Sequence, residues 1–169
     1  MLNRRNLIQS LAALAAPGAA LGVRAKSAEA PLPQIGSVLQ VPAATLLDGR
    51  PWTPSVAQGK VLVVYWWASW CPFCAVQSPH IEALWRAQRA SGLEVLALSI
   101  DSRPAAAVAY MKAKGYSFPA AMYTPQMAKM LPKPRGLPVV VVRGRGGKVV
   151  FAEAGEMFPE DVEGLKKYL

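Results

Sequence analysis

The sequence predicts an α/β domain in which helices flank a central mixed β-sheet. Three largely apolar runs, at 61–67, 93–100 and 139–142, are typical of strands buried on both faces, and the first is rich in β-branched and aromatic residues. Segments with helical features follow the first two runs, and a glycine-rich turn follows the third. The order strand, helix, strand, helix, hairpin and helix favours one sheet that is covered by helices on both faces.

The first half of the domain begins with a short hairpin. Asp48-Gly49 lies between the apolar residues of 46–52, which is a good signal for a tight turn between two strands. The run at 61–67 predicts the first core strand. A helix is predicted from Pro72 to about Ala90, because apolar residues recur there near the 3.6-residue helical repeat.

The second half supplies the remaining strands and helices. The run at 93–100 predicts a second buried strand, and a helix is predicted over 104–114 because that segment begins with proline and ends before Gly115. The elements predicted after it are a short helix at 125–131, a strand at 139–142, a turn at 144–147, a strand at 148–151 and a closing helix at 159–169. We find no internal repeat and no second domain.

Composition excludes several classes of protein. The chain has 169 residues, 53% of them hydrophobic, which fits one ordinary domain and not a disordered chain. Two cysteines cannot build a disulfide framework, and with one histidine they cannot supply the four ligands of a closed zinc site. A Ser-His-Asp triad would have to be built around His80. The two cysteines are therefore the expected centre of any chemistry.

The first 25 residues are typical of an export signal. Met1–Asn6 is short and basic, Leu7–Leu21 is apolar, and small residues follow near Ala25 and Ser27. The apolar run is shorter than the about 20 residues of a spanning helix. Arg4-Arg5 resembles the twin-arginine class of signal, and an ordinary secretory signal is the alternative. The sequence leaves open whether the signal is cleaved or kept as an anchor.

The predicted organisation is an export signal at 1–25, a linker at 26–36 and one domain at 37–169. Residues 1–30 hold four basic and one acidic side chain, so the formal net charge of +9 falls to +6 for the remainder, with 15 basic and nine acidic residues. These charges are spread along the chain, and we expect no nucleic-acid partner. The expected location is the periplasm, where disulfides form and persist.

The informative segment is Cys71-Pro72-Phe73-Cys74, which follows the first core strand. Cys71 stands at the start of a predicted helix, where free N–H groups and the helix dipole stabilise a thiolate. Cys74 lies three residues further along the same helix face, close enough to close a small disulfide. Such a pair can attack a substrate disulfide through Cys71 and release the mixed disulfide through Cys74.

Other roles for the cysteine pair are less favoured by the sequence. Zinc would need further ligands, and His80 lies off the helix face of Cys74 by roughly 120° on the helical repeat. A purely structural disulfide in so small a ring would constrain little of the unfolded chain. Copper bound by the cysteines with Met127 or Met130 is an alternative from another class, although methionines at this spacing are more often core residues.

The segment Trp-Ala-Ser-Trp-Cys-Pro-Phe-Cys at 67–74, together with Gly136-Leu137-Pro138 before a strand, resembles the TlpA/ResA-like thiol-disulfide oxidoreductases of the thioredoxin superfamily. The resemblance covers most of residues 37–169. It implies a thioredoxin fold, a kink at Pro79, a cis peptide before Pro138, and an N-terminal β-hairpin addition at the Asp48-Gly49 turn.

The resemblance also implies a function and a site. Cys71 and Cys74 would form the catalytic pair, with no cofactor beyond their redox-active disulfide and no metal. The substrate-binding residues would be Trp70, Pro72, Phe73, Leu137 and Pro138, with the Leu137 backbone pairing with substrate. The expected activity is reduction of disulfides in extracytoplasmic proteins, apocytochrome c among the possible substrates. An oxidant or isomerase using the same pair is the alternative.

A reductase in this location implies a membrane thiol-electron donor, and we expect a monomer. The dipeptide Pro72-Phe73 brings no charge or hydrogen-bond donor of its own side chains, so we expect an intermediate to reducing potential. Three positions depart from the family pattern. Tyr65 replaces a buried acid, Gln77 replaces a glutamate, and Ala97 replaces a lysine. The groups that assist proton transfer at the second cysteine are therefore expected to be missing.

Overall fold

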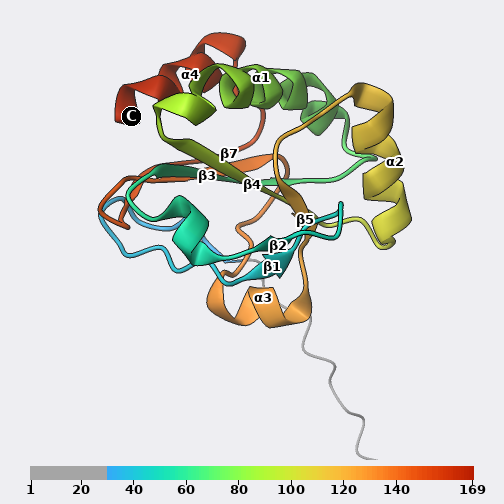
Figure 1. Ribbon diagram of the computed structural model, residues 1–169, viewed down its shortest axis with the longest axis horizontal. Helices are drawn as coiled ribbons and strands as arrows, with labels where there is room; N and C mark the ends of the chain where they lie inside the picture. Colours follow the sequence, from blue (N-terminus) through green and yellow to red (C-terminus); the bar gives the residue numbers. More distant parts are fainter. Residues whose placement is uncertain (1–29) are drawn as a thin grey trace, which may run out of the picture.

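A five-stranded mixed sheet forms the centre of the computed structural model, which describes residues 30–169 (Figure 1). The strand order is β5-β4-β3-β6-β7, in which β3, β4 and β5 are parallel and β6 and β7 run antiparallel to their neighbours. The strands are β3 (Val61–Trp67), β4 (Leu93–Ser99), β5 (Ala120–Met122), β6 (Val139–Arg143) and β7 (Val149–Ala154).

The apolar runs form the inner strands because both of their faces are buried. Every side chain of β3 and β4 is buried, and alternate residues of β3 point to opposite faces of the sheet. Val63, Tyr65 and Trp67 enter one core cluster, which also contains both cysteines. Val64 and Trp66 enter a second cluster on the other face.

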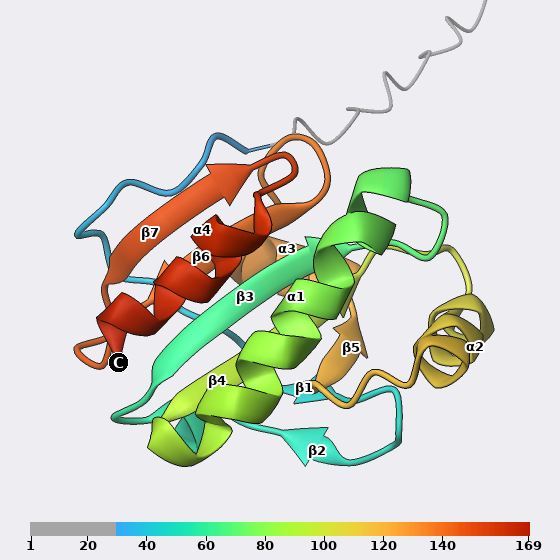
Figure 2. The ribbon, with the colours of Figure 1, turned by 90° about the horizontal axis from the view of Figure 1, so that it is seen from above.

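Helices α1 (Pro72–Gln88) and α4 (Pro159–Gly164) pack together over the first face, and α2 (Pro104–Lys114) lies at the side of the molecule near β5 (Figure 2). The opposite face is covered by α3 (Pro125–Met130) and by a small antiparallel sheet (Figure 1). That sheet consists of β1 (Ala44–Thr45) and β2 (Pro51–Trp52). Three short 3₁₀ helices complete the described elements, at Pro54–Ala57, Arg89–Ser91 and Leu165–Tyr168.

The predicted architecture of a mixed sheet flanked by helices, with an N-terminal hairpin, is confirmed. Gly49 adopts a φ of 86° in the hairpin turn, a conformation that glycine reaches without steric cost. Three elements differ from the prediction, one of which is β7, which ends at Ala154 and not at the predicted residue 151. The short strand β5 was not expected, and it forms because Ala121 can pair with β4 on one side and bridge to Leu46 on the other. The closing helix is α-helical only to Gly164 and continues as a 3₁₀ turn.

The predicted export signal at 1–25 lies outside the described residues, as do the first four residues of the predicted linker at 26–36. Residues 30–36 lie against the domain, where Ala30 pairs with the chain at Lys133 and Arg135 and the Gly36 N–H donates to the Val149 carbonyl. Among the helices of residues 30–169, none is long and apolar enough to cross a membrane.

Candidate active site

Cys71 and Cys74 form a disulfide at the start of α1, with their Cα atoms 5.2 Å apart. Cys71 is the N-cap of the helix, and Pro72 occupies the first helical position, where the missing N–H is not needed. The backbone N–H of Cys74 donates to the Cys71 sulfur at 3.2 Å. This bond and the helix dipole both favour negative charge on Cys71 over charge on Cys74.

The two sulfur-bearing residues differ in access to solvent. Cys71 is 4% exposed, whereas Cys74 is 0% exposed. A substrate sulfur that approaches from solvent therefore meets Cys71 first, and Cys74 is reached only from within the protein. The arrangement separates an outer sulfur whose thiolate is stabilised from an inner sulfur that can attack it.

The loop that leads from β3 to Cys71 is held by a buried carboxylate. Asp101 accepts hydrogen bonds from the Ser69 N–H at 3.1 Å, from the Ser69 hydroxyl at 2.7 Å and from the Ser99 hydroxyl at 2.7 Å. Sequence reasoning missed this carboxylate. A signal existed, because Asp101 closely follows the second buried strand, and the carboxyl ends of parallel strands lie at one edge of a sheet.

A second loop lies beside the cysteine cluster, between α3 and β6. The Leu137–Pro138 peptide bond is cis, as the sequence predicts, and Gly136 adopts a φ of 88°. Leu137 is half-buried and packs against the core cluster that contains the cysteines, while Pro138 is buried. Within residues 30–169, neither the N–H nor the carbonyl oxygen of Leu137 forms a hydrogen bond. These two groups are available to an extended segment of another chain.

Apolar side chains surround the start of α1 on the outside. Trp70 is 65% exposed and Phe73 is 55% exposed, and Pro72 between them is also exposed. Val76, which the sequence reasoning did not include, is exposed one helical turn after Phe73. We call Trp70, Phe73, Val76 and Leu137 the apolar rim. Exposed aromatic side chains gathered beside a reactive group are typical of a protein-binding surface.

The three positions that depart from the family pattern lie where a proton acceptor for Cys74 would be expected. Tyr65 and Ala97 are register partners on β3 and β4. The Tyr65 hydroxyl is 2.9 Å from the Ser78 hydroxyl, and burial raises the pKa of this phenol far above its usual value. Tyr65 therefore stays protonated and cannot accept the proton of the second cysteine.

Gln77 is fully buried one helical turn after Cys74. Its side-chain oxygen accepts a hydrogen bond from the Met157 N–H at 2.8 Å, which fixes the orientation of the amide group. Its amide nitrogen has no hydrogen-bond partner within the described part of the chain. The position holds a neutral side chain, so it cannot serve as a base.

Candidate metal ligands are not brought together. Residues 30–169 contain no group of three or more His, Cys, Asp and Glu side chains that could hold a metal ion. Met127 belongs to the core cluster on the opposite face of the sheet from the cysteines, and Met130 is exposed on α3. His80 lies in the middle of α1, partly exposed beside α4. The copper alternative therefore lacks a common site.

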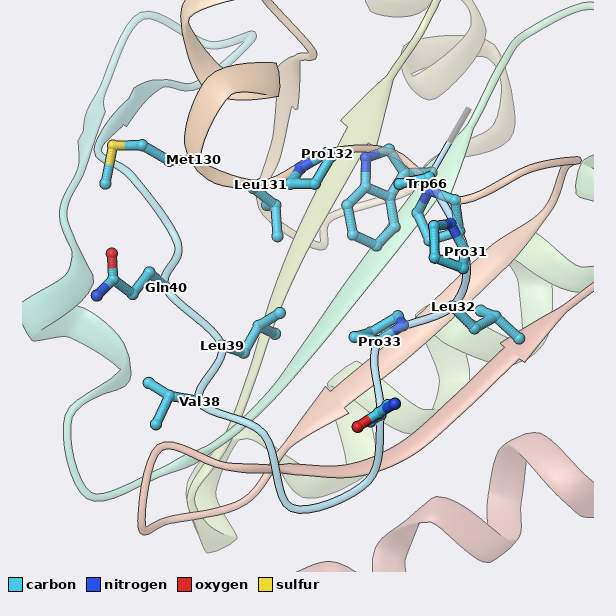
Figure 3. A pocket seen from close by; sticks show the side chains of 13 residues that line it. Pro31, Leu32, Pro33, Val38, Leu39, Gln40, Trp66, Met130, Leu131 and Pro132 are labelled. Atoms are coloured by element: carbon cyan, nitrogen blue, oxygen red, sulfur yellow. The ribbon is translucent and has the colours of Figure 1, made fainter. Parts of the chain in front are cut away.

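An apolar groove of about 480 Å³ lies on the face opposite α1 (Figure 3). One wall is formed by Pro31, Leu32 and Pro33, and Trp66 lies beside Leu131 and Pro132 at another. None of the predicted catalytic and substrate-binding residues lines this groove, although Met130 of the copper alternative does. The site at the start of α1 carries the exposed side chains Trp70, Pro72 and Phe73.

A family model described as Redoxin matches residues 36–169. The thiol-disulfide oxidoreductase ResA of Bacillus thuringiensis (strain Al Hakam) is 28% identical over 134 residues, which cover 79% of this chain and 78% of that protein. The soluble secreted antigen MPT53 of Mycobacterium tuberculosis (strain ATCC 25618 / H37Rv) is 42% identical over 38 residues, 22% of each chain.

Among solved structures, a thiol:disulfide interchange protein of the thioredoxin family from Chlorobium tepidum TLS superimposes with a TM-score of 0.73. The match has 21% sequence identity and covers 80% of this chain and 97% of that one. This likeness confirms the predicted thioredoxin fold.

Proposed function

The chain belongs to the Redoxin family, and we propose that this thiol-disulfide oxidoreductase reduces disulfides in proteins outside the cytoplasm. One observation carries the proposal. A Cys71–Cys74 disulfide stands at a helix start beside the free peptide groups of Leu137. Reactive sulfur and an edge for binding a peptide backbone therefore lie together.

The reduced protein begins the reaction with the Cys71 thiolate. This thiolate attacks one sulfur of a substrate disulfide, the substrate S–S bond breaks, and the departing substrate sulfur takes up a proton. Cys74 then loses its proton and attacks the Cys71 sulfur. The Cys71–Cys74 disulfide forms and the mixed disulfide breaks. The second substrate sulfur also takes up a proton as it leaves, so the substrate is released as a dithiol that has gained two electrons.

The 3.2 Å contact between the Cys74 N–H and the Cys71 sulfur supports the assignment of Cys71 as the attacking group. The complete burial of Cys74 supports its role as the resolving group. Because Tyr65, Gln77 and Ala97 supply no base, water or a substrate group would take the Cys74 proton. Trp70, Pro72 and Phe73 would contact the substrate on one side of the sulfurs, and Leu137 with Pro138 on the other.

The export signal predicted at 1–25 supports a place outside the cytoplasm, and the similarity to a secreted antigen agrees with it. After each cycle the protein must regain two electrons, so a membrane thiol-electron donor is the implied partner. Side chains of Pro72 and Phe73 carry no charge that would stabilise the Cys71 thiolate further. The expected potential is therefore nearer to the about −270 mV of thioredoxin than to the about −120 mV of DsbA.

The first experiment measures insulin reduction by the wild-type protein and by the Cys71→Ser and Cys74→Ser variants. Cys71→Ser should abolish activity, and Cys74→Ser should accumulate a mixed disulfide through Cys71, visible on a non-reducing gel. Reduction of insulin by Cys71→Ser at the wild-type rate would contradict the assignment.

Direction is tested by trapping the redox state of the pair in intact cells with acid and alkylation. A pair found mostly as dithiol supports a reductase. A pair found mostly as disulfide, with a glutathione titration that gives a potential near that of DsbA, would favour the oxidant or isomerase instead.

A further inference from the structure

The loop at 131–138, which carries Leu137 and Pro138, is held by a side chain of its own. The Lys133 ammonium donates to the Pro134 carbonyl at 2.6 Å and to the Gly136 carbonyl at 2.8 Å. Hydrogen bonds from a charged donor to carbonyl oxygens are stronger than neutral ones. Lys133 therefore fixes the chain immediately before Leu137.

Lys133 is itself fixed at both of its peptide groups. Its N–H donates to the Tyr123 hydroxyl at 2.7 Å, and its carbonyl accepts from the Ala30 N–H at 3.1 Å. Tyr123 donates in turn to the Leu131 carbonyl at 2.8 Å. The Lys133 backbone is therefore held through both its N–H and its carbonyl, and this fixes the position from which the side chain reaches the two loop carbonyls.

The adjacent part of the loop is supported by the sheet. Figure 3 shows Leu131 and Pro132 beside Trp66, one residue before the end of β3. The other end of the loop is joined to the start of β6, where the Pro138 carbonyl accepts from the Gly155 N–H at 2.8 Å. Between these two anchors, the carbonyls of Pro134 and Gly136 accept hydrogen bonds from Lys133. Within residues 30–169, no other carbonyl of the loop bonds to a side chain that belongs to the loop.

These hydrogen bonds determine which backbone groups of the loop are left to bond with a substrate chain. The carbonyls before Leu137 are turned to the ammonium, while the N–H and carbonyl of Leu137 form no hydrogen bond within residues 30–169. A loop free to rotate at Gly136 could turn the Leu137 groups away from the substrate. Loss of that freedom before binding increases affinity, because the substrate does not have to order the loop.

We propose that Lys133 is a positioning residue for thiol-disulfide exchange with protein substrates, because its ammonium holds the Leu137 peptide groups in the orientation that pairs with a substrate backbone. In this role Lys133 acts through the loop and not as a catalytic residue. The inference requires only that the protein exchanges disulfides with protein substrates. It applies whether the protein reduces or oxidises them, so it does not depend on the reductase proposal.

The test compares the full-length variants Lys133→Met and Lys133→Arg with Lys129→Met, an exposed lysine on α3. Two substrates are used: insulin, which needs the loop, and 2-hydroxyethyl disulfide, which is too small to pair with a backbone edge. Lys133→Met should raise KM for insulin about tenfold, which corresponds to about 1.4 kcal/mol of binding. Its kcat for insulin and its rate with the small disulfide should stay within about twofold of wild type.

Lys133→Arg should recover most of the affinity, because a guanidinium also offers several donors to the two carbonyls. If Lys133 only stabilised the fold, its loss would not raise KM for insulin while kcat stays the same, and Lys133→Arg would not restore the affinity selectively. If Lys133→Met matches Lys129→Met on insulin, or loses equal activity on both substrates, the inference is wrong.

Two additions keep the test decisive. Where Lys133→Met does not fold, Tyr123→Phe removes the hydroxyl that accepts from the Lys133 N–H and donates to the Leu131 carbonyl. This variant should raise KM for insulin about threefold with the small-disulfide rate unchanged. If the wild-type protein does not reduce insulin, the reductase proposal fails. Oxidation of a peptide dithiol by the disulfide form should then show the same KM difference, and its absence would overturn the role of Lys133.

Discussion

Two irregular loops flank the Cys71–Cys74 disulfide, and charged side chains of opposite sign hold them. In the loop before Cys71, the Asp101 carboxylate accepts from the Ser69 N–H and hydroxyl. In the loop before Pro138, the Lys133 ammonium donates to the carbonyls of Pro134 and Gly136. One loop is held through its donors and the other through its acceptors.

The difference follows from what each loop leaves unsatisfied. The first loop leads into the start of a helix, where N–H groups lack intrahelical partners, so a carboxylate suits it. The second loop contains prolines at 132, 134 and 138, which have no N–H, so its remaining polar groups are mostly carbonyls. An ammonium is the matching donor for that loop.

Both charged groups bond to backbone groups of the loops that they hold. Asp101 is buried, and the Lys133 ammonium lies on backbone carbonyls. The apolar rim of Trp70, Phe73, Val76 and Leu137 between the loops carries no charge of its own. The comparison predicts that the loop near Cys71 controls the sulfur chemistry, while the loop near Pro138 controls substrate binding.

The strongest test of this division is Asp101→Asn. The carboxylate uses both of its oxygens to accept from Ser69 and Ser99, whereas an amide has one acceptor oxygen and a nitrogen that can only donate. We therefore expect a loss of about 3 kcal/mol in the free energy of unfolding. The displaced Cys71 should lower exchange about tenfold with insulin and with 2-hydroxyethyl disulfide alike. Urea unfolding and both exchange assays measure this. Asp161→Asn, an exposed residue of α4, serves as the control. A loss confined to insulin would contradict the division.

A second buried carboxylate, that of Glu82, should affect the stability of the fold without affecting the exchange reaction. Glu82 lies on α1, eight residues beyond Cys74, and accepts from the N–H groups of Ser117 and Phe118 at 2.8 and 3.1 Å, from the Ser117 hydroxyl and from Arg86. Glu82→Gln should cost about 2 kcal/mol at pH 7, or about 6 °C in the unfolding midpoint, and leave exchange rates unchanged. Glu163→Gln, an exposed change, is the control.

The same carboxylate gives a prediction for pH. Burial opposes ionisation of Glu82, but hydrogen bonds from Ser117, Arg86 and the Phe118 N–H outweigh it and lower its pKa below the usual 4.5. A lowered pKa in the folded state means that the stabilisation is complete above pH 4.5 and is lost as the pH falls toward the folded value. The difference in midpoint between wild type and Glu82→Gln should therefore shrink below pH 4.5. An equal difference at pH 7 and pH 3 would refute this.

The smallest expected effect comes from placing a titratable group at position 77, one helical turn after Cys74. Gln77→Glu keeps an acceptor for the Met157 N–H and adds a titratable oxygen one helical turn from Cys74. Because this oxygen can take the Cys74 proton, release of the mixed disulfide should quicken about threefold at pH 7.5 and fall at lower pH. Stopped-flow fluorescence of a trapped substrate measures the release. A rate that matches the control Gln88→Glu at every pH would show that Gln77 is not near the proton path.

Much of the fold follows from local patterns that the chain carries by itself. The run at 61–67 forms β3 with its predicted bounds, because a continuous apolar run is enough to indicate a buried strand. The segment 104–114 forms α2, because the proline at its start and the glycine after its end mark the bounds of a helix locally. The spacing of Cys71 and Cys74 places them close together, since residues three apart at a helix start are neighbours wherever the helix lies in the fold. Gly136-Leu137-Pro138 indicated the cis peptide through its resemblance to a known family.

The sequence by itself thus determined the cysteine pair, the helix that begins there and the sheet behind it. Only the tertiary structure decided how the pair is held, because Asp101 is 32 residues from Ser69, and Ala30 is about a hundred residues from Lys133. It also decided the short strand β5, whose Ala-Ala-Met sequence has no strand preference of its own. Contacts between residues so far apart depend on the packing of the whole sheet, which no local pattern in the chain records.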